Sequence, residues 1–349
     1  MVNQSQIKHL IAGPCSAETR EQVLTVAKDI KEIEGVTMFR AGVWKPRTRP
    51  NSFEGIGEEA LDWLKEVKSD VGLKITTEVA TPEHVEACLK ADLDALWIGA
   101  RTTVNPFYVQ EIADALQGVD IPIYVKNPIS ADFGLWVGAI ERLKKSGLKT
   151  IHAIHRGFFS YNQSIYRNPP LWDLPVKLKA SFPDIDVICD PSHITGNSTL
   201  IEDVSALAFL HGLDGLMIET HPNPQKAWSD AAQQVTPSQL KLIIDRLKNN
   251  KPIDNIDDDD LTVLRNDIGL IDQEILDLLA QRLTIVEQAA KLKKEKLASY
   301  FQLNRWKTVL ADAKKNSDKL NLDENFIDEL MNLIHKESLK LHQKVYNKD

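Results

Sequence analysis

The chain up to about residue 250 alternates between short apolar runs and longer stretches in which apolar residues recur at helical spacing. Short runs rich in β-branched and aromatic residues are typical of buried strands, and apolar residues at steps of three and four predict helices. Helical stretches such as 58–69, 82–90 and 132–146 lie between the strands. The predicted strands are residues 9–12, 37–40, 74–78, 95–99, 121–126, 151–155, 187–189 and 215–219.

Eight strand-then-helix units in about 250 residues predict a TIM (β/α)8 barrel. A doubly wound open sheet is the competing interpretation. That fold requires a glycine-rich phosphate-binding turn after the first strand. The turn here, Gly13-Pro14-Cys15-Ser16, is not glycine-rich. We therefore expect an α/β fold of the barrel type over residues 1–252.

The pattern changes sharply near residue 252. All 16 prolines lie at or before Pro252, and Gly269 is the one glycine after it. The segment 253–260 is polar and acidic, which is typical of a linker. We therefore predict an acidic linker at 253–260 and a separate all-α domain at 261–349.

The long apolar stripe of the second domain predicts one uninterrupted helix over residues 261–297. Such a helix would be about 55 Å long, which exceeds the width of a small domain. Two further helices are predicted at 302–315 and 323–346. Three helices of such unequal length predict an intertwined homodimer, and association beyond the dimer stays open.

Positively charged residues follow the predicted strands of the barrel. One of them alone would ordinarily be a solvated surface charge, but the carboxyl ends of barrel strands meet at one mouth, where active sites lie. Because gathered cations repel one another, they predict a multiply charged anion. Arginine suits bidentate contacts with phosphate and carboxylate, so a small substrate carrying both would fit. These residues are Arg40, Lys45, Arg101, Lys126 and Arg156.

Potential metal ligands follow other strands of the same barrel. Alone, Cys15 would be read as a small buried hydrophobe and His193 as a satisfied core histidine. Together with two carboxylates they form a mixed soft and hard set that suits a divalent ion such as Mn, Fe, Co or Zn. Spacing by itself does not link residues so far apart in the chain. The set is Cys15, His193, Glu219 and Asp230.

Composition and charge weigh against several classes of function. Of the 349 residues, 43% are hydrophobic and 26% charged, as in globular proteins, and the net charge of −8 argues against nucleic acid or a membrane surface as the main partner. The start lacks the layout of a signal peptide, and no apolar run reaches membrane-spanning length. Three scattered cysteines do not make a disulfide scaffold. We expect a reduced, cytoplasmic enzyme.

The motifs of the first domain resemble those of the type I 3-deoxy-D-arabino-heptulosonate 7-phosphate (DAHP) synthases, in their compact beta subfamily. Their order and spacing cover essentially all of residues 1–252. The resemblance implies the first reaction of the shikimate pathway, a metal-dependent condensation of phosphoenolpyruvate with erythrose 4-phosphate. The motifs are IAGPCSAE, RAGVWKPRTRP, WIGARTT, YVKNP, HRGF, CDPSH and GLMIETHPNP with AWSD.

The resemblance also assigns roles to residues. It implies that the four potential ligands bind the metal and that the five strand-end cations hold phosphoenolpyruvate. It implies that Arg47 and Thr48 grip the phosphate of erythrose 4-phosphate, and that Asp190 touches its hydroxyls. The barrel residues assigned to catalysis are Lys45, Lys126 and His193.

The 3-deoxy-octulosonate 8-phosphate synthases are the less favoured interpretation of the barrel. That sister family shares the fold and the phosphoenolpyruvate pocket, but it carries a KANRS-like stretch where this chain reads KPRT at 45–48. Two residues depart from the compact subfamily: Arg49, where a small residue is frequent, and Asn127, where arginine is frequent. Both departures bear on the grip of substrate rather than on the reaction.

Two cations interrupt the apolar stripe of the long tail helix. Arg282 falls where Leu278 and Ile285 predict an apolar residue, and Lys293 lies within about 20° of the same face. If the packed face of this helix buries both cations, an anionic ligand is needed to balance their charge. Arg265 lies on a different face and could reach the pocket of a partner chain in a dimer. A coiled-coil association domain with charged flanks explains the pattern equally well.

The tail also resembles the all-helical chorismate mutases, through LRNDIGLIDQEILDLLAQR, KLKK, LNRW and HKESLKLHQ in residues 261–349. The resemblance implies rearrangement of chorismate to prephenate with no covalent step, with Lys293 on the breaking ether oxygen. Three positions depart from the family: His342 replaces Gln or Glu, Gln302 replaces an acid and Trp306 replaces a glutamate. Catalysis is assigned to Arg282, Lys293 and His342. The substrate-binding positions are Arg265, Arg282, Lys293, Arg305, Ser338 and His342.

Together the two resemblances predict a bifunctional enzyme of the shikimate pathway. Its substrates would be phosphoenolpyruvate, erythrose 4-phosphate and chorismate, and its cofactor a divalent metal ion. The helical domain would also mediate feedback by prephenate or chorismate. Two alternatives remain open for the tail: it only senses such a ligand, or it only holds a dimer together.

Overall fold

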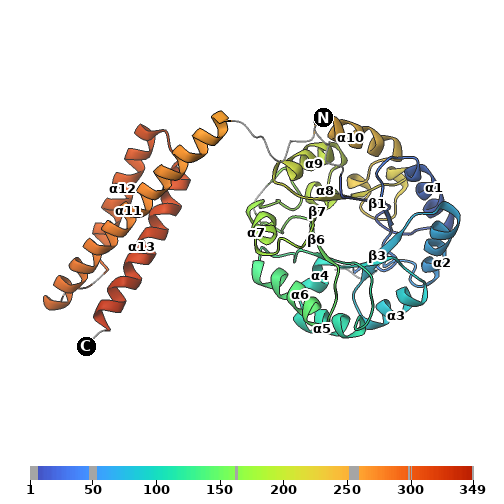
Figure 1. Cartoon of the computed structure of the whole chain (residues 1–349), viewed down its shortest axis with the longest axis horizontal. Coiled ribbons are helices and arrows are strands. Elements are labelled where there is room, and N and C mark those ends of the chain that lie inside the picture. Colours follow the sequence, from blue (N-terminus) through green and yellow to red (C-terminus); the bar gives the residue numbers. More distant parts are fainter. Residues whose placement is uncertain are drawn as a thin grey trace. The chain divides into compact units, whose positions relative to one another are not determined.

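The computed structural model describes residues 7–46, 53–161, 164–250, 259–297, 299 and 301–347. The chain divides into two compact units, Met1–Asp254 and Asn255–Asp349. Figure 1 shows a barrel in the first unit and helices without strands in the second. The predicted linker at 253–260 lies outside the described residues, apart from its last two residues, which begin a helix.

The first unit is a closed barrel of eight parallel strands, in which each strand pairs with its neighbours in the chain and β1 pairs with β8. The prediction of a TIM barrel is therefore confirmed. A ring of helices surrounds the strands (Figure 1). The strands are β1 (His9–Gly13), β2 (Met38–Arg40), β3 (Ile75–Val79), β4 (Ala95–Ile98), β5 (Ile123–Lys126), β6 (Ile151–His155), β7 (Val187–Cys189) and β8 (Gly215–Glu219).

β6, β7 and β8 match the predicted ranges, and the other five strands differ from them by one or two residues at their ends. β5 begins at Ile123 rather than at residue 121, because Pro122 has no N–H to donate to the sheet. β4 ends at Ile98, because Gly99 is already the N-cap of a short helix. The apolar pattern thus predicts that these strands exist, and local backbone chemistry determines where they begin and end.

The helices of the first unit lie between the strands and cover the outside of the barrel. The helix predicted at 58–69 is observed as α2 followed by a π-helical turn at Val67–Val71, which ends at Gly72 in the left-handed region. The helices are α1 (Arg20–Lys31), α2 (Glu59–Glu66), α3 (Pro82–Lys90), α4 (Ala100–Thr103), α5 (Pro106–Ala115), α6 (Phe133–Lys145), α7 (Asp173–Ser181), α8 (Pro191–Thr195), α9 (Ile201–Leu210) and α10 (Pro237–Asn250).

Strand side chains alternate between two apolar cores. On β1, Leu10 and Ala12 pack toward the surrounding helices, whereas Ile11 packs into a smaller cluster with Trp97 and Met217 from other strands. This alternation follows from the two-residue period of a strand and fills the barrel with side chains rather than leaving a pore. The packed interior gives the residues at the strand ends rigid anchors.

The turn after β1 depends on a glycine. Gly13 has a φ of +147°, and a Cβ atom at this position would lie 2.1 Å from the carbonyl oxygen of Arg40. A larger residue would force β1 and β2 apart at their carboxyl ends. Gly13 therefore lets the chain turn tightly against β2 and place Cys15, which is fully buried, at a fixed position.

The second unit consists of α11 (Asp259–Glu295), α12 (Leu303–Leu320) and α13 (Glu324–Tyr346). The three predicted tail helices are confirmed, and α12 continues five residues beyond the predicted end at 315. α13 packs against both other helices. Residues 262–278 of α11 are exposed throughout. None of the helices in the described parts of the chain is long and apolar enough to cross a membrane.

Candidate active sites

The carboxyl ends of the barrel strands surround a cavity of about 360 Å³. Four of the five predicted strand-end cations line it. The fifth, Arg40, is 1% exposed and lies within the barrel. Residues that are distant in sequence thus converge on one mouth, as expected for carboxyl strand ends. The charged and polar lining residues are Lys45, Glu78, Arg101, Lys126, Arg156, Arg167, Asn168, His193 and Asp230.

Cys15 is held by the loop that follows β8. Its backbone N–H donates to Gln234 Oε1 over 3.1 Å, and its Sγ lies 3.4 Å from Asp230 Oδ2. Lys45 Nζ lies 3.0 Å from the same sulfur. Burial and the Glu219 carboxylate raise the pKa of the Cys15 thiol to about 11, although Lys45 acts in the opposite direction. The bare thiol is therefore protonated at neutral pH, and a further positive charge would favour the thiolate.

Asp190 orients two other residues of the mouth. It is the N-cap of α8, and its Oδ1 accepts the backbone N–H of His193 over 3.1 Å. Its Oδ2 lies 2.8 Å from His193 Nδ1 and 2.9 Å from Lys126 Nζ. Although burial opposes ionisation, His193 and Lys126 hold the pKa of Asp190 well below its usual value. One buried carboxylate thus fixes both the imidazole and the ammonium group.

Glu219 ends β8 and faces the other nitrogen of the same imidazole. Its Oε1 lies 3.8 Å from His193 Nε2 and 3.3 Å from Arg40 Nη2, and its Oε2 accepts from Gln233 Nε2 over 2.7 Å. His193 and Arg40 lower the pKa of Glu219 although burial opposes this. Burial lowers the pKa of His193 itself. The carboxylate is therefore ionised and the imidazole neutral at pH 7, which are the forms that bind metals.

The four predicted metal ligands lie as two pairs at this mouth, and one member of each pair, Asp230 or His193, lines the cavity. The separations of 3.4 Å for Cys15–Asp230 and 3.8 Å for His193–Glu219 are close to those of two ligands on one ion with bonds of about 2.0–2.3 Å. No three of these donor atoms lie mutually within 4.8 Å. Glu219 Oε1 is buried and has no hydrogen-bond partner among the described residues. The donor chemistry therefore fits a divalent transition ion.

Asn127, a departure from the subfamily pattern, shapes the loop after β6 instead of lining the cavity. It is fully buried, its Oδ1 accepts the backbone N–H of Arg156 over 2.7 Å, and its Nδ2 donates to the carbonyl of Gly157 over 2.8 Å. Arg156 is 8% exposed, and burial lowers its pKa to about 10. Asn127 thus positions a cation that stays charged at neutral pH. Arg47, Thr48 and Arg49 lie outside the described residues.

In the helical unit, three of the predicted site residues are linked. Arg282 Nη1 donates to Ser338 Oγ over 2.7 Å, and Nδ1 of His342 lies 2.9 Å from the Ser338 carbonyl oxygen. Ser338 and His342 are buried between the helices. The link joins α11 to α13, so the cation that interrupts the apolar stripe has a defined place.

The other predicted mutase residues differ in their exposure. Lys293 is half-buried, and Arg265 and Arg305 are exposed. Trp306 stacks on His335 with ring centroids 4.0 Å apart. A cavity of about 640 Å³ in this unit is lined by other residues of α11 and α13, namely Glu287, Lys291, Lys294, Glu295, Leu341, Lys344 and Val345.

Comparison with known families agrees with this division of the chain. Residues 4–253 match the DAHP synthetase I family. The chain belongs to the DAHP synthetase I family. Residues 264–343 match chorismate mutase type II, so this family member joins a DAHP synthase domain, a transferase, to a chorismate mutase domain, an isomerase.

Individual relatives of this DAHP synthetase I family member match its barrel. Phospho-2-dehydro-3-deoxyheptonate aldolase of Thermotoga maritima is 29% identical over 239 residues, which are 68% of this chain and 68% of the relative. A 2-dehydro-3-deoxyphosphooctonate aldolase of Dechloromonas aromatica is 28% identical over 241 residues, or 63% of this chain and 83% of the relative. The crystal structure of the DAHP synthase from Thermotoga maritima has a TM-score of 0.62 at 28% identity, covering 69% of this chain and 68% of that one.

The structure adds residues to the mouth of this DAHP synthase domain that the sequence pattern does not reveal. Arg167 Nη1 lies 3.0 Å from Asp230 Oδ1 and donates to Gln233 Oε1 over 2.9 Å. Gln233 in turn binds Glu219. Arg167 lies twelve residues beyond the end of β6, so a search limited to the residues at strand ends does not find it. Its position beside Asp230 is a product of tertiary folding.

Proposed function

We propose that the barrel condenses phosphoenolpyruvate with erythrose 4-phosphate to give DAHP and inorganic phosphate. The observation that carries the proposal is the mouth where strand-end cations and the Cys15, His193, Glu219 and Asp230 donor set meet. Crowded cations in a partly buried site need an anion of several charges. Phosphoenolpyruvate carries both a phosphate and a carboxylate on three carbons, which matches that need.

The cations would neutralise and orient phosphoenolpyruvate. Asp190 fixes the ammonium group of Lys126, Asn127 fixes the backbone of Arg156, and the Gly157 carbonyl accepts from Arg156 Nη1 over 3.3 Å, so both cations are held in place before the anion arrives. Such preorganised charge favours both binding and the charge that develops on the departing phosphate. We assign the phosphoenolpyruvate contacts to Arg40, Lys45, Arg101, Lys126 and Arg156.

The proposed chemistry needs no proton removed from the nucleophile, which is the vinyl carbon of phosphoenolpyruvate. Water adds at the neighbouring carbon, and phosphate leaves. What the ion held by the four ligands would supply is Lewis-acid polarisation of the aldehyde oxygen of erythrose 4-phosphate. Asp190 keeps His193 and Lys126 in place. If Asp190 also contacts the sugar hydroxyls, one of its carboxylate oxygens would serve both a hydroxyl and a residue that it already binds. Arg47 and Thr48 are proposed to grip the sugar phosphate.

The test of this function is phosphate release from phosphoenolpyruvate with each of two sugar phosphates. We expect metal-dependent release with the four-carbon erythrose 4-phosphate. Release with the five-carbon arabinose 5-phosphate alone would instead support a 3-deoxy-octulosonate 8-phosphate synthase, the less favoured interpretation of the barrel. A chelated sample with re-added Mn²⁺, Co²⁺ or Zn²⁺ identifies the ions that support turnover.

Replacing Arg167 with alanine is expected to weaken metal binding without abolishing the reaction. Arg167 and His193 lower the pKa of Asp230, so its removal raises that pKa and makes the ligand easier to protonate. Loss of such a supporting contact typically costs about 10–100-fold in metal affinity. Titration of the chelated variant with metal, followed by phosphate release, would show this loss. In the pH–rate profile of the synthase, the acid limb would move to higher pH. An unchanged titration would show that Arg167 does not support the ligand.

We propose that the helical unit rearranges chorismate to prephenate. The link from Arg282 to Ser338 and His342 supports this, because it holds a guanidinium group at the place where the apolar stripe is broken. Arg305 and Lys293 would complete the charge around the two carboxylates and the ether oxygen of chorismate. Arg265, on a different face, would come from the second chain of a dimer.

The exposed first half of α11 supports the proposed homodimer. Val263, Leu264, Ile268, Ile271 and Ile275 are each about half exposed or more. An apolar stripe of this length is not ordinarily left in water, because each large side chain gains about 1.5–3 kcal/mol when fully buried. A second copy of the same helix would cover it and bring Arg265 to the partner's site.

Replacing Ile271 with glutamate should therefore convert the dimer to monomers. The expected result in sedimentation velocity is a halved mass, accompanied by loss of mutase activity because Arg265 no longer reaches its site. Gln273→Glu, which adds the same charge at another exposed position of the helix, is the matched control. A dimeric, active Ile271→Glu variant would contradict the proposed interface.

We propose further that prephenate or chorismate bound to the helical unit changes the rate of the synthase. Adding prephenate to the full-length chain during phosphate release tests this directly. Turnover of chorismate rules out a tail that is only a sensor or only a dimerisation module. No turnover and no ligand effect would leave dimerisation as its role. A reducing, cytoplasmic setting is also proposed, since Cys15, Cys88 and Cys189 are free thiols.

A further inference from the structure

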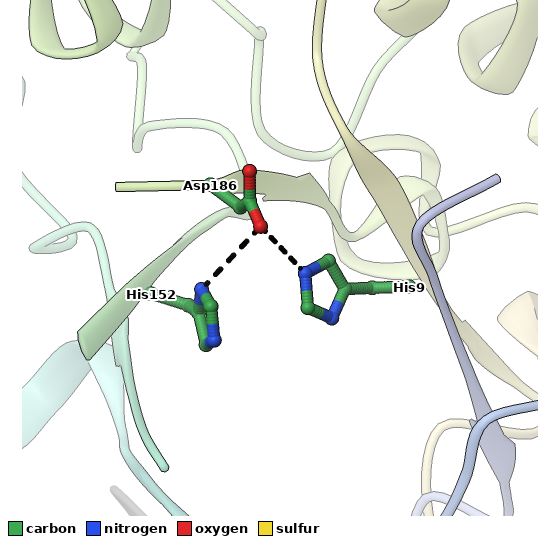
Figure 2. Close-up of side chains that lie close together, drawn as sticks. All are labelled: His9, His152 and Asp186. Carbon is green, nitrogen blue, oxygen red and sulfur yellow. Dashed lines mark hydrogen bonds and ion pairs between the residues drawn. The ribbon is translucent and has the colours of Figure 1, made fainter. Parts of the chain in front are cut away.

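Two histidines and an aspartate lie close together (Figure 2). They lie at or near the amino ends of barrel strands, whereas the mouth lies at the carboxyl ends. His9 begins β1, His152 lies near the start of β6, and Asp186 directly precedes β7. Asp186 Oδ2 lies 2.9 Å from His9 Nε2 and 3.9 Å from His152 Nδ1. One donor atom from each residue lies within 4.8 Å of the other two. This is the one such group among the described residues.

We propose that His9, His152 and Asp186 form a second, structural site for a divalent transition ion such as Zn²⁺. Two imidazoles and one carboxylate are a donor set that zinc accepts, with water as the fourth ligand. Ligand atoms around a tetrahedral zinc with bonds of about 2.0–2.1 Å lie about 3.3 Å apart. The two measured separations fall on either side of this value, so small side-chain rotations complete the site.

Two of the three side chains, His152 and Asp186, are in the protonation states that a metal requires. His152 Nδ1 is a buried atom with no hydrogen-bond partner among the described residues. Burial and the neighbouring His9 lower the pKa of His152 to about 4, so the imidazole is neutral. Lys8 and His9 lower the pKa of Asp186 to about 2 although burial opposes this. The ring of Tyr124 packs against both imidazoles and limits their movement.

One cation of the chain competes for this site. Lys8 Nζ lies 2.8 Å from Asp186 Oδ1 and 3.0 Å from Asp214 Oδ1. Lys179 binds the other oxygen of Asp214, so the charges facing the cluster are balanced when no ion is bound. The side chain of Lys8 is 60% exposed and can withdraw into solvent when a divalent ion arrives. The geometry therefore predicts that removal of Lys8 tightens metal binding.

The position of the cluster indicates what a bound ion does. β1 pairs with β8, β8 with β7 and β7 with β6, so the cluster spans the closure between the first strand and the last ones. Residues at the amino ends of barrel strands serve stability rather than catalysis. An ion here would clip β1 to β6 and β7 and stabilise the closed barrel without entering the reaction.

The test counts Co²⁺ and Zn²⁺ bound to the full-length chain by equilibrium dialysis. Cys15→Ala removes the thiolate of the mouth, so any cobalt bound there loses its thiolate charge-transfer absorption. We expect the Cys15→Ala variant to bind one more equivalent of metal than the Cys15→Ala/His152→Ala variant. The cobalt spectrum of Cys15→Ala should show nitrogen and oxygen ligands only. Equal metal content in these two variants would overturn the proposal.

A second variant keeps the proposal testable if the loss of His152 disturbs folding. Lys8→Ala in the Cys15→Ala background is expected to bind zinc about tenfold more tightly and to melt at a higher temperature in zinc than without it. Lys144→Ala removes a lysine paired with Asp184 over 2.7 Å near the same end of the barrel and is the matched control. Equal zinc affinity in the Lys8 and Lys144 variants would contradict the site.

Discussion

Replacing Cys15 with alanine is expected to lower synthase activity at least a thousandfold while leaving mutase activity unchanged. The proposed ion is worth several kcal/mol in the transition state, and a loss of about 4 kcal/mol corresponds to about a thousandfold in rate. Cys15 is the soft ligand of the set and is anchored through Gln234 and the turn at Gly13. Phosphate release and chorismate consumption, measured on the same sample, separate the two activities.

Cys88→Ala is the matched control for this substitution. Cys88 is an equally buried thiol on α3, outside the mouth, and burial raises its pKa to about 12. Its loss should cost some stability and little activity. The Cys15 thiol also lies beside Lys45, so a loss of activity could come from a misplaced lysine. Chelation of the wild-type chain distinguishes these causes, and full synthase activity in metal-free protein would refute the metal role.

Replacing Arg282 with alanine is expected to lower kcat/KM of the mutase by about 100–1,000-fold and to leave the synthase unaffected in the absence of effector. A preorganised charged donor to a carboxylate or a developing oxyanion is worth this much in a water-poor site. Arg282 is held by Ser338, so its loss removes a fixed charge rather than a mobile one. Initial rates of chorismate consumption by the full-length chain provide the measurement.

Lys291→Ala is the control for the Arg282 substitution, because Lys291 lies on the same helix and its ammonium group pairs with Glu287 on the surface. It should retain mutase activity. If Arg282→Ala also retains it, the helical unit does not use the linked residues for chemistry. The tail would then be a ligand sensor or a dimerisation module, and prephenate inhibition of the synthase would decide between the two.

The barrel could be predicted because its signals are local. Each strand is a short apolar run, each helix has its own period and caps, and the order of the eight units leaves little choice of topology. The convergence of Lys45, Lys126 and His193 followed from the same rule, since carboxyl strand ends share one edge. The differences at β4 and β5 arise at Gly99 and Pro122, where single-residue backbone chemistry ends a strand.

The residues that support these side chains could not be found in this way. Arg167 reaches Asp230 from a long loop, and Gln233 joins Glu219 from a short helical turn after β8. Loop paths depend on the packing of the whole domain, so no local pattern predicts them. The cluster of His9, His152 and Asp186 lies at the opposite ends of the strands. Taken singly, each of these residues is an ordinary polar residue near the start of a strand, so the sequence pattern does not single it out.

The sequence by itself determined the eight strand-helix units, the break before the helical tail, the three tail helices and the charged residues that follow the strands. Periodicity and turn chemistry are written into neighbouring residues, so they survive without knowledge of the fold. Only the tertiary structure decided which of these groups touch: the Cys15–Asp230 and His193–Glu219 pairs, the supporting Arg167 and the cluster at the amino ends. Those contacts join residues far apart in the chain, and barrel closure alone brings them within a few ångströms.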